Sequence, residues 1–212
     1  LARIAIQNQV DSLIAYRQTA KSGFFKKPAP STETLREVAE RDENTRVHKQ
    51  AILNDSIEMH LNESREKQQS LGFLLLDVDR LGSFAENNGQ EAADDLICET
   101  ASVLVTSLRT NDFVVRSGDD EFIAILPGAD STMIKNISER IRFRFAAMKP
   151  APSGSRPAVS CSIGAVRCDP GGRKHPQVKQ ILRELDSAVF QSKKRGGNHV
   201  SVINLTGTKS KP

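Results

Sequence analysis

Long apolar runs are missing from this sequence. Uncharged apolar runs such as Leu71 to Leu76 fall far short of the roughly 20 residues that a helix needs to cross a bilayer, so we expect no membrane span in this chain. Aromatic residues make up 5% of the chain, Trp is absent, and Lys and Arg form no block with interleaved aromatics. The pI near 9.1 therefore argues only weakly for nucleic acid, and an anionic small ligand fits it equally well.

Cysteine is also scarce. Cys98, Cys161 and Cys168 lack CxxC spacing, which argues against a disulfide framework and against a zinc site. The chain begins with Leu1 instead of Met and carries no basic-then-apolar leader. We therefore expect a cytoplasmic fragment of a longer protein.

The composition that is present favours a folded α/β domain with a helical appendage. The 212 residues are 38% hydrophobic and carry a net charge of +4, which excludes a disordered chain. In residues 1–41, apolar residues at helical spacing predict helices on both sides of a Pro- and Gly-containing linker at Ser22 to Ser31. We expect these signalling helices to pair two chains into a homodimer, because an apolar stripe needs a partner.

Residues 42–205 alternate between helix and strand patterns, and residues 206–212 are expected to form a flexible tail. The predicted strands are Phe73–Val78, Phe113–Arg116, Glu121–Leu126, Ala158–Val166 and His199–Ile203, and the predicted helices are centred on Ile57, Leu104, Ile141 and Leu185. Ser117 to Asp120 would turn a hairpin, with a positive φ at Gly118. The pattern predicts an α/β fold with a mixed sheet and flanking helices.

Two acidic clusters stand at strand ends. Asp77 and Asp79 end the first predicted strand, and Asp119, Asp120 and Glu121 lie in the hairpin turn. Carboxylates placed in this way can hold Mg²⁺ against nucleotide phosphates. On spacing alone, solvated turn residues are the better interpretation, because Asp and Gly favour turns for conformational reasons.

Four motifs, in order, make the sequence resemble the GGDEF family. They are Asp77-Val-Asp79, Arg116-Ser-Gly-Asp-Asp-Glu-Phe122, Ser162-Ile-Gly164 and Lys193-Lys-Arg-Gly-Gly-Asn-His-Val200, and the resemblance runs from about Asp42 to Ile203. Members of that family condense two GTP into the bacterial messenger cyclic di-GMP. The resemblance implies a palm-like nucleotide-cyclase fold preceded by N-terminal helices.

Several functional positions of the family are intact. The resemblance assigns Mg²⁺ binding to Asp77, to the carbonyl of Val78 and to Asp120. It makes Asp120 and Glu121 the catalytic signature residues. It further implies that Asp94 recognises guanine and that Lys193 reaches the triphosphate.

Other positions depart from the family pattern. Asp119 stands where the family has its second signature glycine, and its charge would repel phosphate. Gly82 and Gly197 replace a lysine and an arginine, and Ala85 replaces a guanine-binding asparagine. Each lost charge-assisted contact typically costs about 1.5–3 kcal/mol, so the resemblance implies an inactive or feeble cyclase with vestigial Asp120 and Glu121.

A second site is better preserved. Arg109-Thr-Asn-Asp112 is similar to the family's RxxD motif, which binds cyclic di-GMP away from the active site, and Arg140 falls where a further product-binding arginine often lies. An Arg–Asp surface pair without a ligand is the alternative.

The leading hypothesis for the function is a regulatory module that binds cyclic di-GMP or docks a protein partner. An active dimeric diguanylate cyclase is the second hypothesis, and a scaffold with both sites dead is the third. We expect no nucleic-acid partner.

Overall fold

The computed structural model describes residues 40–148, 159–169 and 176–205. The helices and linker predicted before residue 40 and the tail from residue 206 lie outside the described residues. In chain order the elements are β1 (His48–Lys49), the 3-10 helix η1 (Gln50–Ile52), α3 (Leu53–Glu66), β2 (Leu71–Val78), α4 (Leu81–Asn88), α5 (Gln90–Ser107), β3 (Phe113–Arg116), β4 (Glu121–Pro127), α6 (Ser131–Ala146), β5 (Cys161–Cys168), α7 (Val178–Lys194) and β6 (Val200–Leu205).

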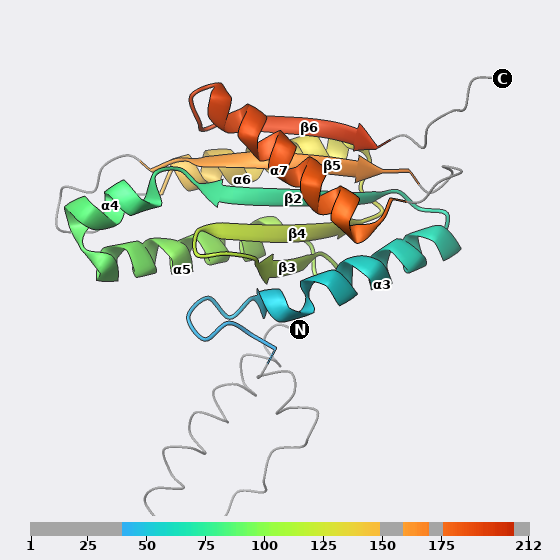
Figure 1. Ribbon diagram of the computed structural model, residues 1–212, viewed down its shortest axis with the longest axis horizontal. Helices are drawn as coiled ribbons and strands as arrows, with labels where there is room; N and C mark the ends of the chain where they lie inside the picture. Colours follow the sequence, from blue (N-terminus) through green and yellow to red (C-terminus); the bar gives the residue numbers. More distant parts are fainter. Residues whose placement is uncertain (1–39, 149–158, 170–175, 206–212) are drawn as a thin grey trace, which may run out of the picture. The chain divides into compact units, whose positions relative to one another are not determined.

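The strands form one mixed sheet in the order β1-β3-β4-β2-β5-β6. β2 is antiparallel to both β4 and β5, whereas β1 is parallel to β3 and β5 is parallel to β6. Helices α4, α5 and α6 pack on one face of the sheet, and α3 and α7 pack on the other (Figure 1). The predicted mixed sheet with flanking helices is confirmed.

The central strand β2 explains why the sheet needs helices on both faces. All eight of its residues are buried, and alternate side chains point to opposite faces. Leu74 and Leu76 belong to the core beneath α5 and α6, while Phe73 and Leu75 belong to the core beneath α3 and α7. A strand that is apolar on both faces therefore separates two cores, as its uninterrupted apolar run indicates.

The register of β2 places the acidic clusters together. Asp77 lies opposite Glu121 on β4 and opposite Ser162 on β5. Because neighbouring antiparallel strands run in opposite directions, the end of β2 meets the start of β4 and the start of β5 at one edge of the sheet. The polar residues of three strands thus share this edge.

The structure corrects three local predictions. Helix α4 is a separate element that the apolar pattern did not indicate, and β5 begins at Cys161, three residues later than predicted. Gly118 is not among the residues with positive φ, so the predicted left-handed turn residue was wrong. Four residues connect β3 to β4, and Ser117 N–H and Gly118 N–H both donate to the Glu121 carbonyl, which closes the hairpin without a left-handed residue.

Two of the three thiols are shielded by the sheet. Cys161 and Cys168 are buried and free, and Cys98 on α5 is half-buried and free. Burial raises the pKa of the Cys161 thiol strongly, and it raises the pKa of Cys168 to about 12. Within the described ranges, no helix is both long enough and apolar enough to cross a membrane.

Candidate functional site

The predicted metal ligands lie side by side at the polar edge of the sheet. Val78 N–H donates to the Asp120 carbonyl at 3.1 Å, which ties the end of β2 to the turn before β4. Asp77 is the preceding residue and its side chain is 6% exposed. The structure thus brings Asp120 next to Asp77 and Val78, from which it is distant in the sequence.

Lys193 reaches this edge from the last turn of α7. Its Nζ donates to Asp77 Oδ2 at 2.6 Å. Burial raises the pKa of Asp77, the Lys193 contact opposes that rise, and the nearby Asp120 and Asp79 add to it. For Lys193, partial burial lowers the pKa, but the hydrogen bond and charge of Asp77 outweigh this effect and leave it above its ordinary value.

Glu121 is the neighbouring signature acid on β4. Burial raises its pKa, and the charges of Asp77, Asp120 and Asp186 add to the rise. The neighbouring carboxylates thus add to the effect of burial at both Asp77 and Glu121.

Asp79 is fully engaged in holding this edge together. Its Oδ2 accepts from Ser160 Oγ at 2.6 Å and from Asn198 N–H at 2.9 Å, and its Oδ1 accepts from Ser162 Oγ at 2.7 Å. Asn198 itself has a φ of 49° and accepts from Arg142 of α6 at 2.9 Å through Oδ1. Asp79 thus anchors the loop after α7, and its oxygens are already occupied.

One feature of this polar edge fits a divalent cation, namely a carboxylate oxygen without a hydrogen-bond partner. Asp77 Oδ1 is buried and has no hydrogen-bond partner among the described residues, and a hard cation satisfies such an oxygen. Within residues 40–148, 159–169 and 176–205, however, no group of three or more His, Cys, Asp or Glu side chains is arranged to hold a metal ion. Asp77, Asp120 and the backbone at Val78 are the residues that would hold Mg²⁺.

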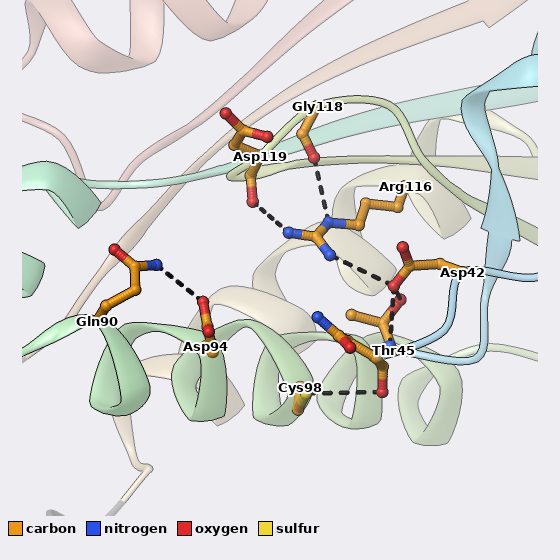
Figure 2. A network of polar contacts seen from close by, with 9 residues as sticks. Asp42, Thr45, Gln90, Asp94, Cys98, Arg116, Gly118 and Asp119 are labelled. Atoms are coloured by element: carbon orange, nitrogen blue, oxygen red, sulfur yellow. Dashed lines mark hydrogen bonds and ion pairs between the residues drawn. The ribbon is translucent and has the colours of Figure 1, made fainter.

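The signature turn is held from inside by Arg116, the last residue of β3. Its guanidinium donates to the carbonyls of Gly118 at 3.2 Å and Asp119 at 2.9 Å, and it pairs with Asp42 Oδ1 at 3.3 Å (Figure 2). Burial raises the pKa of Asp42, but hydrogen bonds from Thr45 and the charge of Arg116 bring it below its ordinary value. This network ties the signature turn to the loop at Asp42.

Asp119, the residue that departs from the family signature, is exposed. Figure 2 shows its carbonyl directed to Arg116 and its carboxylate directed away from it. Asp119 is not among the residues with positive φ, so the turn does not need glycine there for its backbone conformation. The substitution changes charge and bulk without straining the turn.

Asp94 lies on α5, across from the signature turn (Figure 2). It is exposed and accepts from Gln90 Nε2 at 2.8 Å. One turn further along the same helix, Cys98 Sγ donates to the Asn44 carbonyl at 3.6 Å. The aspartate that was predicted to recognise guanine is therefore exposed on α5, with one oxygen accepting from Gln90.

The other departures differ in what the structure would accept. A Cβ at Gly82 would meet no described atom within 4 Å, so a longer side chain fits there. Gly197 has a φ of 78°, and a Cβ there would lie 3.0 Å from Asp79 Oδ2. Arginine at Gly197 would be strained by both its backbone and its neighbour.

The RxxD residues lie in the turn after α5. Asp112 Oδ2 accepts from the Arg109 N–H at 2.7 Å, and the Asp112 N–H donates to the Arg109 carbonyl at 3.1 Å. Burial raises the pKa of Asp112, while the N–H and charge of Arg109 and the charge of Arg140 oppose the rise. The motif therefore forms a closed turn with the exposed Arg109 side chain outside it.

Helix α6 brings two arginines to the same place. Arg140 Nη2 donates to the Ser107 carbonyl at 2.6 Å, and Arg144 Nη1 donates to the Thr106 carbonyl at 3.1 Å. These carbonyls belong to the last turn of α5, where a cation is favourable. Arg109, Asp112 and Arg140 are thus brought together, and Arg144 joins them.

Residues 39–199 match the family model described as "Diguanylate cyclase, GGDEF domain". This match covers well over half of the chain, and the chain therefore belongs to the GGDEF family. It is 31% identical over 133 residues to the diguanylate cyclase DosC of Escherichia coli K12, and this match covers 62% of this chain and 28% of that protein. It is 27% identical over 173 residues to the diguanylate cyclase DgcM of the same organism, and this match covers 79% of this chain and 39% of that protein. The chain thus spans less than half the length of these relatives.

Solved structures share the fold. The coiled coil and GGDEF domain of DgcB from Caulobacter crescentus, solved with c-di-GMP, superposes with a TM-score of 0.74 at 21% identity and covers 95% of this chain and 98% of that chain. The diguanylate cyclase SiaD from Pseudomonas aeruginosa, solved with its activator SiaC, superposes with a TM-score of 0.72 at 20% identity. The match covers 96% of this chain and 73% of that chain. The palm-like fold implied by the sequence motifs is confirmed.

Sequence reasoning missed three contributors to these sites. Arg116 was noted as part of a motif, but its hold on the turn carbonyls was not predicted. Asp79 was grouped with the metal-binding acids, yet it accepts three hydrogen bonds from the protein. Arg144 could have been found from the sequence, because it lies four residues after Arg140 and so on the same face of α6.

Proposed function

We propose that this chain is a degenerate GGDEF domain that binds cyclic di-GMP at Arg109, Asp112 and Arg140 and has little or no cyclase activity. One observation carries the proposal. Helix α6 and the loop after α5 bring Arg140 and Arg109 close to Asp112, in a motif that keeps the family's RxxD spacing. Arg144 binds the same end of α5. A ligand with two phosphates and two guanines suits guanidinium groups, which donate bidentately to phosphate and stack on bases.

The state of the nucleotide edge supports the same proposal. The cations of the family pattern are absent at Gly82 and Gly197, the guanine contact is absent at Ala85, and Asp119 adds a negative charge. Phosphoryl transfer depends on positioning and on neutralising phosphate charge. A domain that lost these contacts and kept the RxxD turn is better suited to sensing the product than to making it.

An active diguanylate cyclase is the second candidate. The adjacent Asp77 and Asp120, with the orphaned Asp77 Oδ1, favour it. In that case Mg²⁺ would supply charge neutralisation for two GTP, and each subunit of a dimer would present one of them. We also infer that residues 1–41 mediate homodimerisation, and light scattering before and after their deletion tests it: an unchanged mass would contradict it.

Calorimetry with cyclic di-GMP tests the proposed function. Arg109→Ala should weaken binding roughly ten- to a hundredfold, because it removes charge-assisted contacts worth about 1.5–3 kcal/mol. Asp120→Ala at the metal edge should leave binding nearly unchanged. Arg183→Ala is the matched control, since Arg183 is an exposed arginine on α7 that pairs with its neighbour Glu184.

Two outcomes would contradict the proposed function. Absence of binding heat from the unmodified chain would leave a scaffold or a partner-docking role. Equal loss of affinity in Arg109→Ala and Asp120→Ala would show that the ligand does not distinguish the RxxD turn from the metal edge.

A further inference from the structure

Lys193 forms an ion pair with Asp77, the carboxylate that we expect to hold a divalent cation. Asp77 is the most buried carboxylate of the edge, with a side chain 6% exposed, whereas the Lys193 side chain is 45% exposed. One oxygen of Asp77 accepts from the ammonium at 2.6 Å. The other oxygen is buried and has no partner among the described residues.

Asp79 is less available to a cation than Asp77. Both oxygens of Asp79 accept hydrogen bonds from Ser160, Ser162 and the Asn198 N–H. Asp120 adds charge from the signature turn. A divalent cation at this edge therefore depends on Asp77, and Asp77 already has a cationic partner.

We propose that Lys193 is an internal competitor for the divalent cation at Asp77. Its ammonium offsets the charge of the buried carboxylate when no metal is bound, so a metal must compete with it for that charge. Lysine suits this role because it is a point charge on a flexible stem and its exposed side chain can swing to solvent. When phosphate draws the ammonium away, the same carboxylate becomes free for the metal, so metal and phosphate should enter together.

This inference concerns the metal edge and does not depend on cyclic di-GMP binding at Arg109. The test is a titration of the full chain with Mn²⁺, in which the free ion is measured by electron paramagnetic resonance. Lys193→Met keeps the length and apolar stem of the side chain and removes its charge. Because the lysine is half exposed, its removal should tighten Mn²⁺ binding by about three- to tenfold.

Three control variants make the titration specific. Lys194→Met removes the neighbouring charge, whose ammonium lies over the Phe190 ring instead, and it should leave Mn²⁺ binding within twofold of the unmodified chain. Lys193→Arg should behave like the unmodified chain, since it keeps a positive charge at this position. Adding Asp77→Asn to Lys193→Met should abolish the gain.

Each opposite result would overturn the proposal. Unchanged or weaker Mn²⁺ binding in Lys193→Met would show that the ammonium does not compete. An equal gain in Lys194→Met would show a general charge effect. No measurable Mn²⁺ binding by any variant would show that the edge is not a cation site, while the calorimetric test at Arg109 would still stand or fall by itself.

Discussion

The two candidate sites stand at opposite ends of one short strand. The RxxD turn leads into β3 at Phe113, and the signature turn follows β3 after Arg116, so four residues separate them. At the RxxD end, the charges of Arg109 and Arg140 favour ionised Asp112. Arg140 and Arg144 also donate to carbonyls in the last turn of α5. At the signature end, Asp77 lies near the carboxylates of Asp120, Asp79 and Glu121. Its buried Oδ1 has no partner among the described residues.

This difference shows which site is complete without a ligand. The RxxD turn is closed by its own hydrogen bonds, and its arginines still have donors to spare because a guanidinium carries five N–H groups. At the metal edge, burial and the neighbouring charges raise the pKa of Asp77, and its ion pair with Lys193 offsets only part of this effect. A ligand therefore adds contacts at one end and removes repulsion at the other.

The largest expected effect is on turnover. With GTP and Mg²⁺ the unmodified chain should form no cyclic di-GMP, or traces several powers of ten below an active cyclase, because four contacts are lost or reversed. Product can be measured by chromatography. Robust product formation would show that the charge differences at the signature end do not matter.

Restoration should partly reverse this loss. Asp119→Gly, Gly82→Lys and Ala85→Asn together should raise turnover, and adding Asp77→Asn should silence it again. Arginine at Gly197 should not help, because the positive φ and the nearby Asp79 carboxylate oppose it. If Gly197→Arg gave the largest gain, the account of that loop would be wrong.

A smaller effect should separate the two ends by stability. Arg116→Ala removes the donors to two turn carbonyls and to Asp42, and should lower the free energy of unfolding by about 1–3 kcal/mol. Cyclic di-GMP binding should remain, because the RxxD turn has its own hydrogen bonds. Thermal unfolding and calorimetry measure the two quantities, with Arg183→Ala as control; a matching loss of binding would show that the ends are coupled through β3.

The smallest effect should come from Asp77→Asn. Burial raises the pKa of Asp77 in the folded chain above its ordinary value of 3.8, so ionisation costs folding free energy at neutral pH. The variant should therefore melt about 2–4 °C higher at pH 7, a gain of about 1 kcal/mol.

The gain from Asp77→Asn should depend on pH in a defined direction. It is complete above the raised pKa, shrinks as pH falls through it, and vanishes below the ordinary value, where both states are protonated. Melting curves between pH 7 and pH 3 follow this change. A lower melting temperature for Asp77→Asn at pH 7 would show that the ion pair with Lys193 outweighs burial.

Much of the fold could be predicted because hydrophobic patterning is local. The doubly apolar β2 predicts a strand that is buried on both faces, and the structure has it. The ion pair of Lys193 with Asp77 was not predicted, because the family motifs imply only that this lysine reaches the triphosphate. Tertiary roles were harder to predict. Nothing in the spacing distinguishes Asp77, which keeps one oxygen without a partner among the described residues, from Asp79, both of whose oxygens accept hydrogen bonds. The reason is that the partner of Asp77 comes from α7, whereas those of Asp79 come from the start of β5 and from the loop after α7.

Helix α4 and the signature turn were missed or misjudged for a related reason. α4 is short and buries one apolar side chain, Phe84, so its amphipathic signal is weak. The turn at Gly118 was assigned a left-handed residue from composition, whereas the guanidinium of Arg116 and the Glu121 carbonyl decide its shape. Hydrogen bonds from a side chain to turn carbonyls are not reflected in the turn propensities of the single residues.

The three cysteines also make the folded domain a convenient carrier for a spectroscopic label. Two thiols are shut inside the sheet, and Cys98 is the half-buried one, one helical turn from Asp94 and in contact with the Asn44 carbonyl. Burial and the Asp95 charge raise the pKa of Cys98, so its thiolate forms less readily than that of a free cysteine and labelling there calls for alkaline buffer. A dye at that position would report movement between α5 and the loop at Asp42 without any engineered cysteine.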